Sequence, residues 1–182
     1  DFGNYDKTAF FQNLKNNAVK NVTTIGINFK TTPDNNGILF LNSGDINLTN
    51  DLDMEGKPKT FILENGDLYI DGDFKITDGF AAFVVRNGDI IIDKGVQHFE
   101  GIFIAETGAI KSKSDQISKQ QLRLSGALLG DLSPLLQMRQ YVGHDFHNIE
   151  PSVEIIYDLR TVEQTPPALQ KFLGEDWREE VQ

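Results

Sequence analysis

The chain contains no cysteine in its 182 residues. This absence excludes disulfide bonds, metal sites built from thiolates and a cysteine nucleophile, but it leaves the cellular compartment open. Long apolar runs are also missing. No stretch approaches the roughly 20 consecutive apolar residues that a membrane-spanning helix needs, so we expect no membrane insertion within this chain.

Basic residues are scarce. Seventeen lysines and arginines stand against 27 aspartates and glutamates, which gives a formal net charge of −10. Such a surface repels phosphate backbones, so we expect no nucleic-acid partner. The chain also lacks a glycine-rich phosphate loop, a nucleophile elbow and a dinucleotide-binding fingerprint. No linear motif therefore identifies a reaction.

What the sequence does contain is a repeat. Three stretches share an apolar run, a turn with a Gly-Asp pair and a second apolar run: LFLNSGDINLT, FILENGDLYID and FVVRNGDIIID, which begin at Leu39, Phe61 and Phe83. The Gly-Asp pair recurs after 22 residues each time, and a further glycine follows after 20. Such fixed-period self-similarity is the main sequence signature of a repeat architecture.

Each stretch taken alone resembles a β-hairpin, because Asn-Gly tolerates the positive φ angles of a tight turn. A full period, however, contains three short apolar runs, such as 61–63, 68–70 and 74–76. Three runs favour a three-faced coil, in which each run lies on its counterpart one rung away. We predict an all-β fold, a right-handed parallel β-helix (solenoid) of about five rungs. Phe61, Phe83 and Phe103 should stack inside it.

The repeat begins near Val22, and the prediction for the chain before it is different. In residues 1–21, Phe10, Leu14 and Ala18 recur at helical spacing, which predicts one amphipathic α-helix. We expect this helix to cap one end of the solenoid, residues 22–142, since open rungs expose unpaired strand edges. A helix that binds a partner is the alternative interpretation.

Residues 143–182 follow the repeat and are predicted to form an extended C-terminal tail that packs on the solenoid. Pro166 and Pro167 force extended chain at that point and prevent a helix across it.

Several motifs of the C-terminal half occur in a recognisable order: LRLSGALLGDLSPLLQMRQY, then PSVEIIYDLR, TPPAL and DWREEV. In this order the chain resembles a family of bacterial surface β-solenoid proteins of the candidate-phyla type, similar to the β-helical C-terminal region of PilX-like pilus-assembly proteins. The resemblance covers roughly residues 60–182 and implies a secreted or cell-surface location, without implying catalytic residues. The matching positions are Gly126, Gly130, Arg139, Tyr141, Pro151, Tyr157, Asp158, Pro166, Pro167, Trp177 and Arg178.

Aspartates at the repeated corner are the candidate metal ligands. Asp45, Asp67 and Asp89 should stack on successive rungs, where calcium would relieve the repulsion between like charges. The glycine-rich calcium-binding repeat of other β-helices is absent, and an aspartate after Asn-Gly also satisfies the backbone of its own turn. Solvated turns and a weak calcium site therefore both stay open, and no other cofactor is expected.

Tyr69, Asp71 and Asp73 are the candidate binding residues. Tyr69 lies between Leu68 and Ile70, so strand alternation should point it outwards on a long flat face. Such a face suits a protein or a glycan partner. We expect a non-enzymatic, extracytoplasmic structural or adhesive domain of pilus or cell-surface type. The alternative is a β-helix that binds or cleaves polysaccharides, but no carboxylate pair stands out as catalytic.

Overall fold

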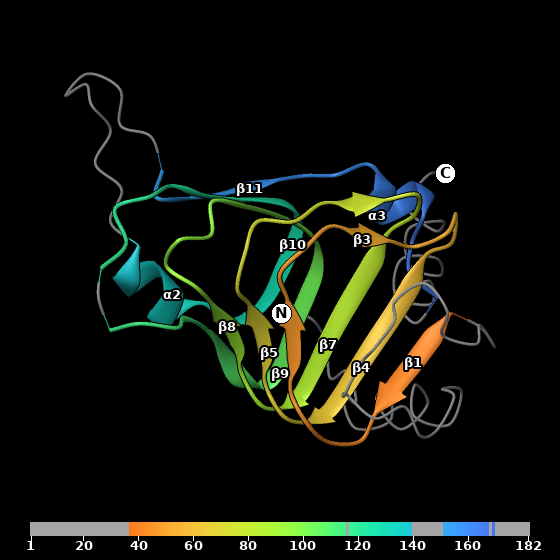
Figure 1. The fold of residues 1–182 in the computed structure, drawn as a ribbon, viewed down its shortest axis with the longest axis horizontal. Coiled ribbons are helices and arrows are strands. Elements are labelled where there is room, and N and C mark those ends of the chain that lie inside the picture. Colours follow the sequence, from red (N-terminus) through yellow and green to blue (C-terminus); the bar gives the residue numbers. More distant parts are fainter. Residues whose placement is uncertain (1–36, 116, 140–150, 168, 170–182) are drawn as a thin grey trace, which may run out of the picture.

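The computed structural model describes residues 37–115, 117–139, 151–167 and 169. In these residues the chain winds into a parallel β-solenoid of about four turns (Figure 1). Every pairing between the strands is parallel, so the Gly-Asp stretches are corners of a coil and the hairpin alternative is wrong. The expected capping helix and first rung lie outside the described residues, and five rungs and the right-handed winding stay predictions.

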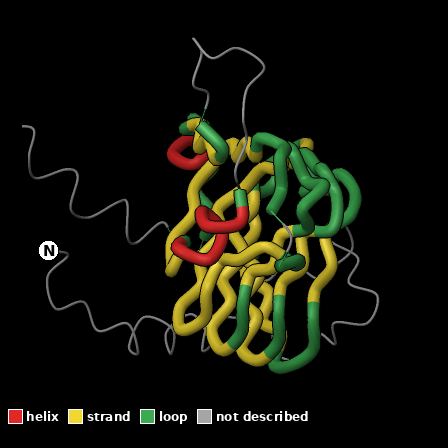
Figure 2. Tube along the Cα trace, turned by 90° about the vertical axis from the view of Figure 1, so that its left-hand side faces the viewer, coloured by secondary structure: helices red, strands yellow, loops and turns green. Residues whose placement is uncertain are grey.

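The coil has three faces, and Figure 2 shows its turns stacked on one another. The first face contains, in spatial order, β1 (Ile38–Leu41), β4 (Lys59–Asn65), β7 (Ala81–Asn87), the first part of β9 (His98–Ser112), β10 (Leu122–Asp131) and β11 (Val153–Ile156). The second face contains β2 (Ile46–Leu48), β5 (Leu68–Ile70), β8 (Ile90–Ile92) and the second part of β9. The third pairs β3 (Leu52–Asp53) with β6 (Ile76–Thr77).

A ladder of phenylalanines runs through the interior, as the period predicts. Phe61 is in register with Phe83, and Phe83 with Phe103. Their rings are stacked, with centroids 5.1 Å and 5.3 Å apart. All three side chains are buried. The predicted interior stack is confirmed, because a parallel register places equivalent residues of successive turns directly on one another.

The first face is apolar on its outer side too. Phe40, Ile62 and Val84 are in register, point away from the phenylalanine ladder and are nevertheless buried. Strands that are buried on both sides have nearly continuous apolar sequences, whereas a strand with one wet side alternates. This explains why β1 and β7 lack the alternation seen in β2. Leu169, from the C-terminal tail, packs on a neighbouring part of this outer side, beside Phe80, Ala82 and Ile102.

In the described part of the chain two short helices interrupt the strands, α2 (Ser133–Met138) and α3 (Arg160–Glu163). The sequence analysis did not identify α2, whose Leu135 is buried in the main core. Just after α2, the buried Arg139 donates hydrogen bonds to the carbonyl oxygens of Asp93 at 2.7 Å and Val96 at 2.9 Å. Among the described residues, neither helix is long and apolar enough to cross a membrane.

Replacing Phe83 by alanine tests the interior ladder. Phe83→Ala should lower the free energy of unfolding by about 3–5 kcal/mol, because the substitution leaves a cavity between two stacked rings. Urea denaturation measures the change. Tyr157→Ala, at an exposed aromatic position, is the control and should change stability by less than about 1 kcal/mol. A similarly small effect at Phe83 would contradict its interior placement.

Candidate functional site

The repeated corner between the first and second faces holds the three candidate metal ligands. Each follows a glycine, and the glycine is required by the close approach of successive turns. A Cβ atom at Gly88 would lie 2.0 Å from the carbonyl oxygen of Gly66, and one at Gly108 would lie 2.0 Å from that of Gly88. Gly88 is therefore required by the close backbone contact. The sequence analysis had explained it instead by a turn with a positive φ angle.

The aspartates form a ladder of hydrogen bonds along this corner. Asp45 Oδ1 accepts a hydrogen bond from the backbone N–H of Asp67 at 2.9 Å. Asp67 Oδ1 accepts one from Asp89 N–H at 2.8 Å, and Asp89 Oδ1 accepts one from Ala109 N–H at 2.8 Å. Each carboxylate thus binds the amide of the next turn, at the point where the chain passes from one face to the other.

Lys111 neutralises the last aspartate of this ladder. Its Nζ donates to Asp89 Oδ2. Burial alone would raise the pKa of Asp89, but the hydrogen bonds from Lys111 and from the amide of Ala109 outweigh it, and the pKa is lowered. The pKa of Lys111 is raised, chiefly by the same hydrogen bond. Asp89 and Lys111 therefore stay charged across the neutral pH range.

The ladder bears directly on the calcium hypothesis. One oxygen each of Asp45, Asp67 and Asp89 is turned towards a backbone amide of the next turn. In the part of the chain that the structure describes, no group of three or more acidic or histidine side chains is arranged to hold a metal ion. The structure thus places the three predicted residues together as hydrogen-bond acceptors, and calcium binding stays a prediction.

Tyr69 and Asp71 come together on the outer side of the second face. Tyr69 is half-buried between the buried neighbours of β5, so its side chain points outwards as expected. Its hydroxyl donates to Asp67 Oδ2 at 3.4 Å. Lys113 Nζ lies 5.5 Å from the ring centroid and forms an ion pair with Asp71 Oδ1 at 2.6 Å. We call Tyr69, Asp71 and Lys113 the tyrosine cluster.

Burial raises the pKa of Tyr69, and the carboxylates of Asp67 and Asp45 add to the rise. The tyrosine therefore stays protonated at neutral pH and can donate a hydrogen bond. The cluster combines an aromatic ring, a hydroxyl donor, a cation and an anion on one flat face. These are the groups with which a protein surface contacts a sugar or a polar peptide.

Asp73 does not join the tyrosine cluster. Its Oδ1 accepts hydrogen bonds from the backbone N–H groups of Gln97, at 2.7 Å, and His98, at 3.1 Å. Asp73 thus supports the backbone of the following turn, as the corner aspartates do. Of the three predicted binding residues, the structure brings Tyr69 and Asp71 together, whereas Asp73 accepts two hydrogen bonds from the backbone.

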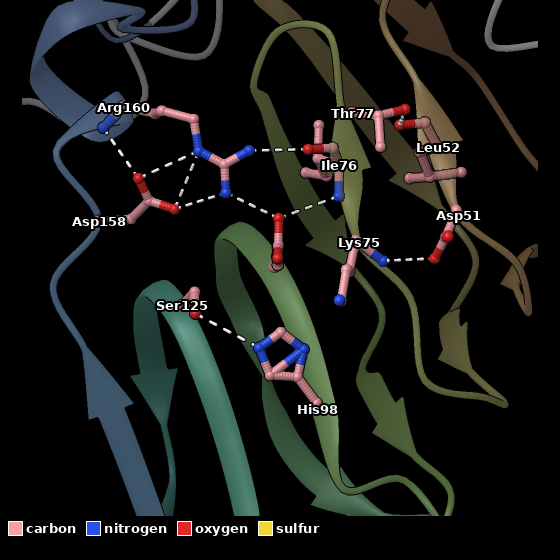
Figure 3. A network of polar contacts seen from close by, with 10 residues as sticks. Asp51, Leu52, Lys75, Ile76, Thr77, His98, Ser125, Asp158 and Arg160 are labelled. Carbon is pink, nitrogen blue, oxygen red and sulfur yellow. Dashed lines mark hydrogen bonds and ion pairs between the residues drawn. The ribbon is translucent and has the colours of Figure 1, made fainter.

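A polar network that the sequence analysis did not identify joins the C-terminal tail to the coil (Figure 3). Arg160 Nη1 donates to the carbonyl oxygen of Ile76 at 2.7 Å, and its Nη2 pairs with Glu100 Oε2 at 2.7 Å and Asp158 Oδ2 at 2.6 Å. Its guanidinium lies 5.2 Å from the ring centroid of Phe80. Asp158 is one of the motif positions of the resemblance, but no signal in the sequence identified its partner.

Ser125 and His98 lie beside this network. Ser125 Oγ is 3.4 Å from His98 Nε2, longer than the usual separation of a nucleophile and its base. Among the described residues, no carboxylate is hydrogen-bonded to the His98 ring to orient it. The pair joins β9 to β10 and lacks the third member of a catalytic triad in this part of the chain.

Gly88→Ala tests the close contact at the corner. The added methyl group would collide with a backbone carbonyl that cannot move without its whole turn, so we expect a loss of about 3 kcal/mol in unfolding free energy. Gly95→Ala is the matched control, because its Cβ would meet only the end of the Asp93 side chain, at 3.2 Å. Equal effects in urea denaturation would argue against the contact.

Asp89→Asn tests the ladder through its pH dependence. Because the folded-state pKa of Asp89 is lowered, its carboxylate contributes stability above the ordinary aspartate pKa of about 3.9, and this contribution is lost as the pH falls through the folded value. The stability advantage of the wild type over Asp89→Asn should be constant from about pH 7 to about pH 5 and shrink below about pH 4. Urea unfolding at a series of pH values measures it.

The exposed Asp115→Asn variant is the control for the loss of one negative charge and should be about as stable as the wild type at neutral pH. An advantage over Asp89→Asn that grows as the pH falls would contradict the ladder.

Comparisons of this chain with protein-family models, with curated proteins and with solved structures found no match. The resemblance to bacterial surface solenoids therefore rests on the motifs of the sequence alone.

Proposed function

We propose that this chain is a structural or adhesive β-solenoid domain that acts without catalysis. The observation that carries the proposal is that the aspartates of the repeat form hydrogen bonds and ion pairs within the coil. The corner aspartates and Asp73 accept hydrogen bonds from the amides of the next turn, and Asp71 is paired with Lys113. The aspartates that the sequence analysis singled out are thus engaged in contacts within the coil.

The architecture suits a rigid body. Successive turns satisfy one another's backbone hydrogen bonds, and a ladder of stacked rings fills the interior. Such a coil presents long flat sides to a partner and needs no deep cleft to be stable. Placement outside the cytoplasm, at the cell surface or in a pilus, is the part of the proposal that draws on the resemblance of the C-terminal motifs.

Polysaccharide binding is the second candidate function, and the tyrosine cluster favours it. Tyr69 offers a partly exposed ring, and Lys113 and Asp71 lie close enough to hydrogen-bond a sugar bound beside that ring. Cleavage would require in addition two carboxylates at a defined separation, one of them protonated. Asp71 and Asp73 are the candidates, and their present partners are a lysine and two backbone amides.

A screen of acidic and neutral polysaccharides, with and without calcium, tests the proposal. We expect no shortening of any polymer in product sizing by chromatography. Reproducible depolymerisation that disappears in Asp71→Asn or Asp73→Asn would overturn the proposal of a non-catalytic domain and favour a polysaccharide-cleaving enzyme.

Binding in the same screen is measured by affinity electrophoresis. If the tyrosine cluster binds glycans, Tyr69→Ala and Lys113→Ala should each weaken retention about tenfold, the effect of losing roughly 1.4 kcal/mol. Lys75→Ala, an exposed lysine outside the cluster, is the matched control and should bind as the wild type does. Retention that is equal in all variants would place binding elsewhere on the molecule.

A further inference from the structure

Two Asn-Gly pairs lie at the repeated corner, Asn65-Gly66 and Asn87-Gly88, and an aspartate follows each of them. An asparagine before glycine is prone to lose ammonia spontaneously, because glycine has no side chain to hinder attack by its backbone nitrogen on the asparagine side chain. Both asparagines are exposed, so water reaches either one. The local sequence and the exposure therefore do not distinguish the two pairs, and their hydrogen bonds have to.

Hydrogen bonds hold the side-chain amide of Asn65 at both ends. Its Nδ2 donates to the carbonyl oxygen of Asn42 at 3.0 Å, and its Oδ1 accepts a hydrogen bond from Asn87 Nδ2 at 3.2 Å. The backbone N–H of Gly66 donates to the carbonyl oxygen of Asn87 at 3.4 Å. The two groups that would react in this pair, the side-chain amide and the glycine nitrogen, are thus both engaged with neighbouring turns.

The side-chain amide of Asn87 is held at one end only. Its Nδ2 donates to Asn65, but no described residue donates to its Oδ1 or accepts a hydrogen bond from the backbone N–H of Gly88. In the next turn Thr107 takes the place of a third asparagine. Its hydroxyl donates to the carbonyl oxygen of Arg86 at 2.5 Å. The series of side-chain amides along the corner therefore ends at Asn87.

We propose that Asn87 is a site of spontaneous modification, at which the folded coil deamidates in preference to Asn65. The backbone N–H of Gly88 loses its proton to hydroxide, and the nitrogen attacks the side-chain carbonyl carbon of Asn87. The new C–N bond closes a five-membered succinimide ring, and the side-chain nitrogen takes a proton from water and leaves as ammonia. A second water molecule opens the ring at either of its carbonyl carbons, which gives aspartate or isoaspartate.

The modification breaks a link between two turns. A carboxylate at position 87 has no N–H to donate to Asn65 Oδ1, so the amide of Asn65 is then held at one end, and its own deamidation should follow. Isoaspartate also lengthens the backbone by one carbon, next to the close contact between Gly88 and Gly66. This inference is independent of the proposed function, since it requires neither the tyrosine cluster nor a partner.

Peptide mapping by mass spectrometry, after incubation of the whole chain at mildly alkaline pH, tests the proposal. In the folded protein Asn87 should deamidate about tenfold faster than Asn65, because the additional hydrogen bonds of the Asn65 pair have to break first. In urea that unfolds the coil, the two rates should become similar, since both pairs continue with the same Asn-Gly-Asp sequence. A third pair, Asn36-Gly37, begins outside the described residues and falls in a separate peptide.

This test needs no variant, so it does not depend on whether a mutant folds. Equal rates at Asn87 and Asn65 in the folded protein would mean that both react through global unfolding, and would overturn the proposal. A faster reaction at Asn65, or a reaction at either site that occurs in urea alone, would overturn it too.

Asn87→Asp tests the link between the two sites. The variant removes the donor to Asn65 Oδ1, so Asn65 should deamidate about threefold faster than in the wild type, the effect of one lost hydrogen bond. Asn47→Asp is the matched control, because it adds the same charge at an exposed position of β2 and should leave the Asn65 rate unchanged. An Asn65 rate that is the same in Asn87→Asp as in the wild type would contradict the link.

Discussion

The register between successive turns is the constraint on which the rest of the structure depends. Parallel strands of neighbouring turns lie about 4.8 Å apart, so each side chain meets the equivalent side chain of the next turn. At an interior position this is favourable, because Phe61, Phe83 and Phe103 stack with well-matched rings. At a corner it leaves no room for a Cβ atom, as at Gly88. The same close stacking of turns that favours aromatic side chains in the interior requires glycine at the corner.

The corner aspartates show how the coil manages charge. Stacking would set like charges about 5 Å apart, at a cost of roughly 1 kcal/mol or less per pair in water-like surroundings. Each carboxylate instead accepts a hydrogen bond from a backbone amide of the next turn. The chain passes from one face to the other at this point, and the amide would otherwise be left unpaired. Lys111 then balances the last of them. These acidic residues thus stabilise the fold through the backbone of the next turn.

The C-terminal tail is attached by contacts of another kind. Arg160 inserts its guanidinium between an acid of the tail, Asp158, and an acid of the coil, Glu100, and it also binds a carbonyl oxygen of the coil. Leu169 adds an apolar contact on the outer side of the first face. Within the described residues the tail also contributes β11, whose Ile155 and Ile156 are exposed, whereas β1 at the other end of the first face is buried.

The sequence by itself determined the features that follow from the period. The parallel coil, the interior ring ladder and the corner alignment of Asp45, Asp67 and Asp89 could be predicted, because residues one period apart must become neighbours. The tertiary structure alone decided what lies outside the period. Arg160 and Glu100 are 60 residues apart in the chain, and no repeat predicts their meeting. The partner of each aspartate oxygen was likewise decided by backbone geometry, since sequence spacing aligns the carboxylates without orienting them.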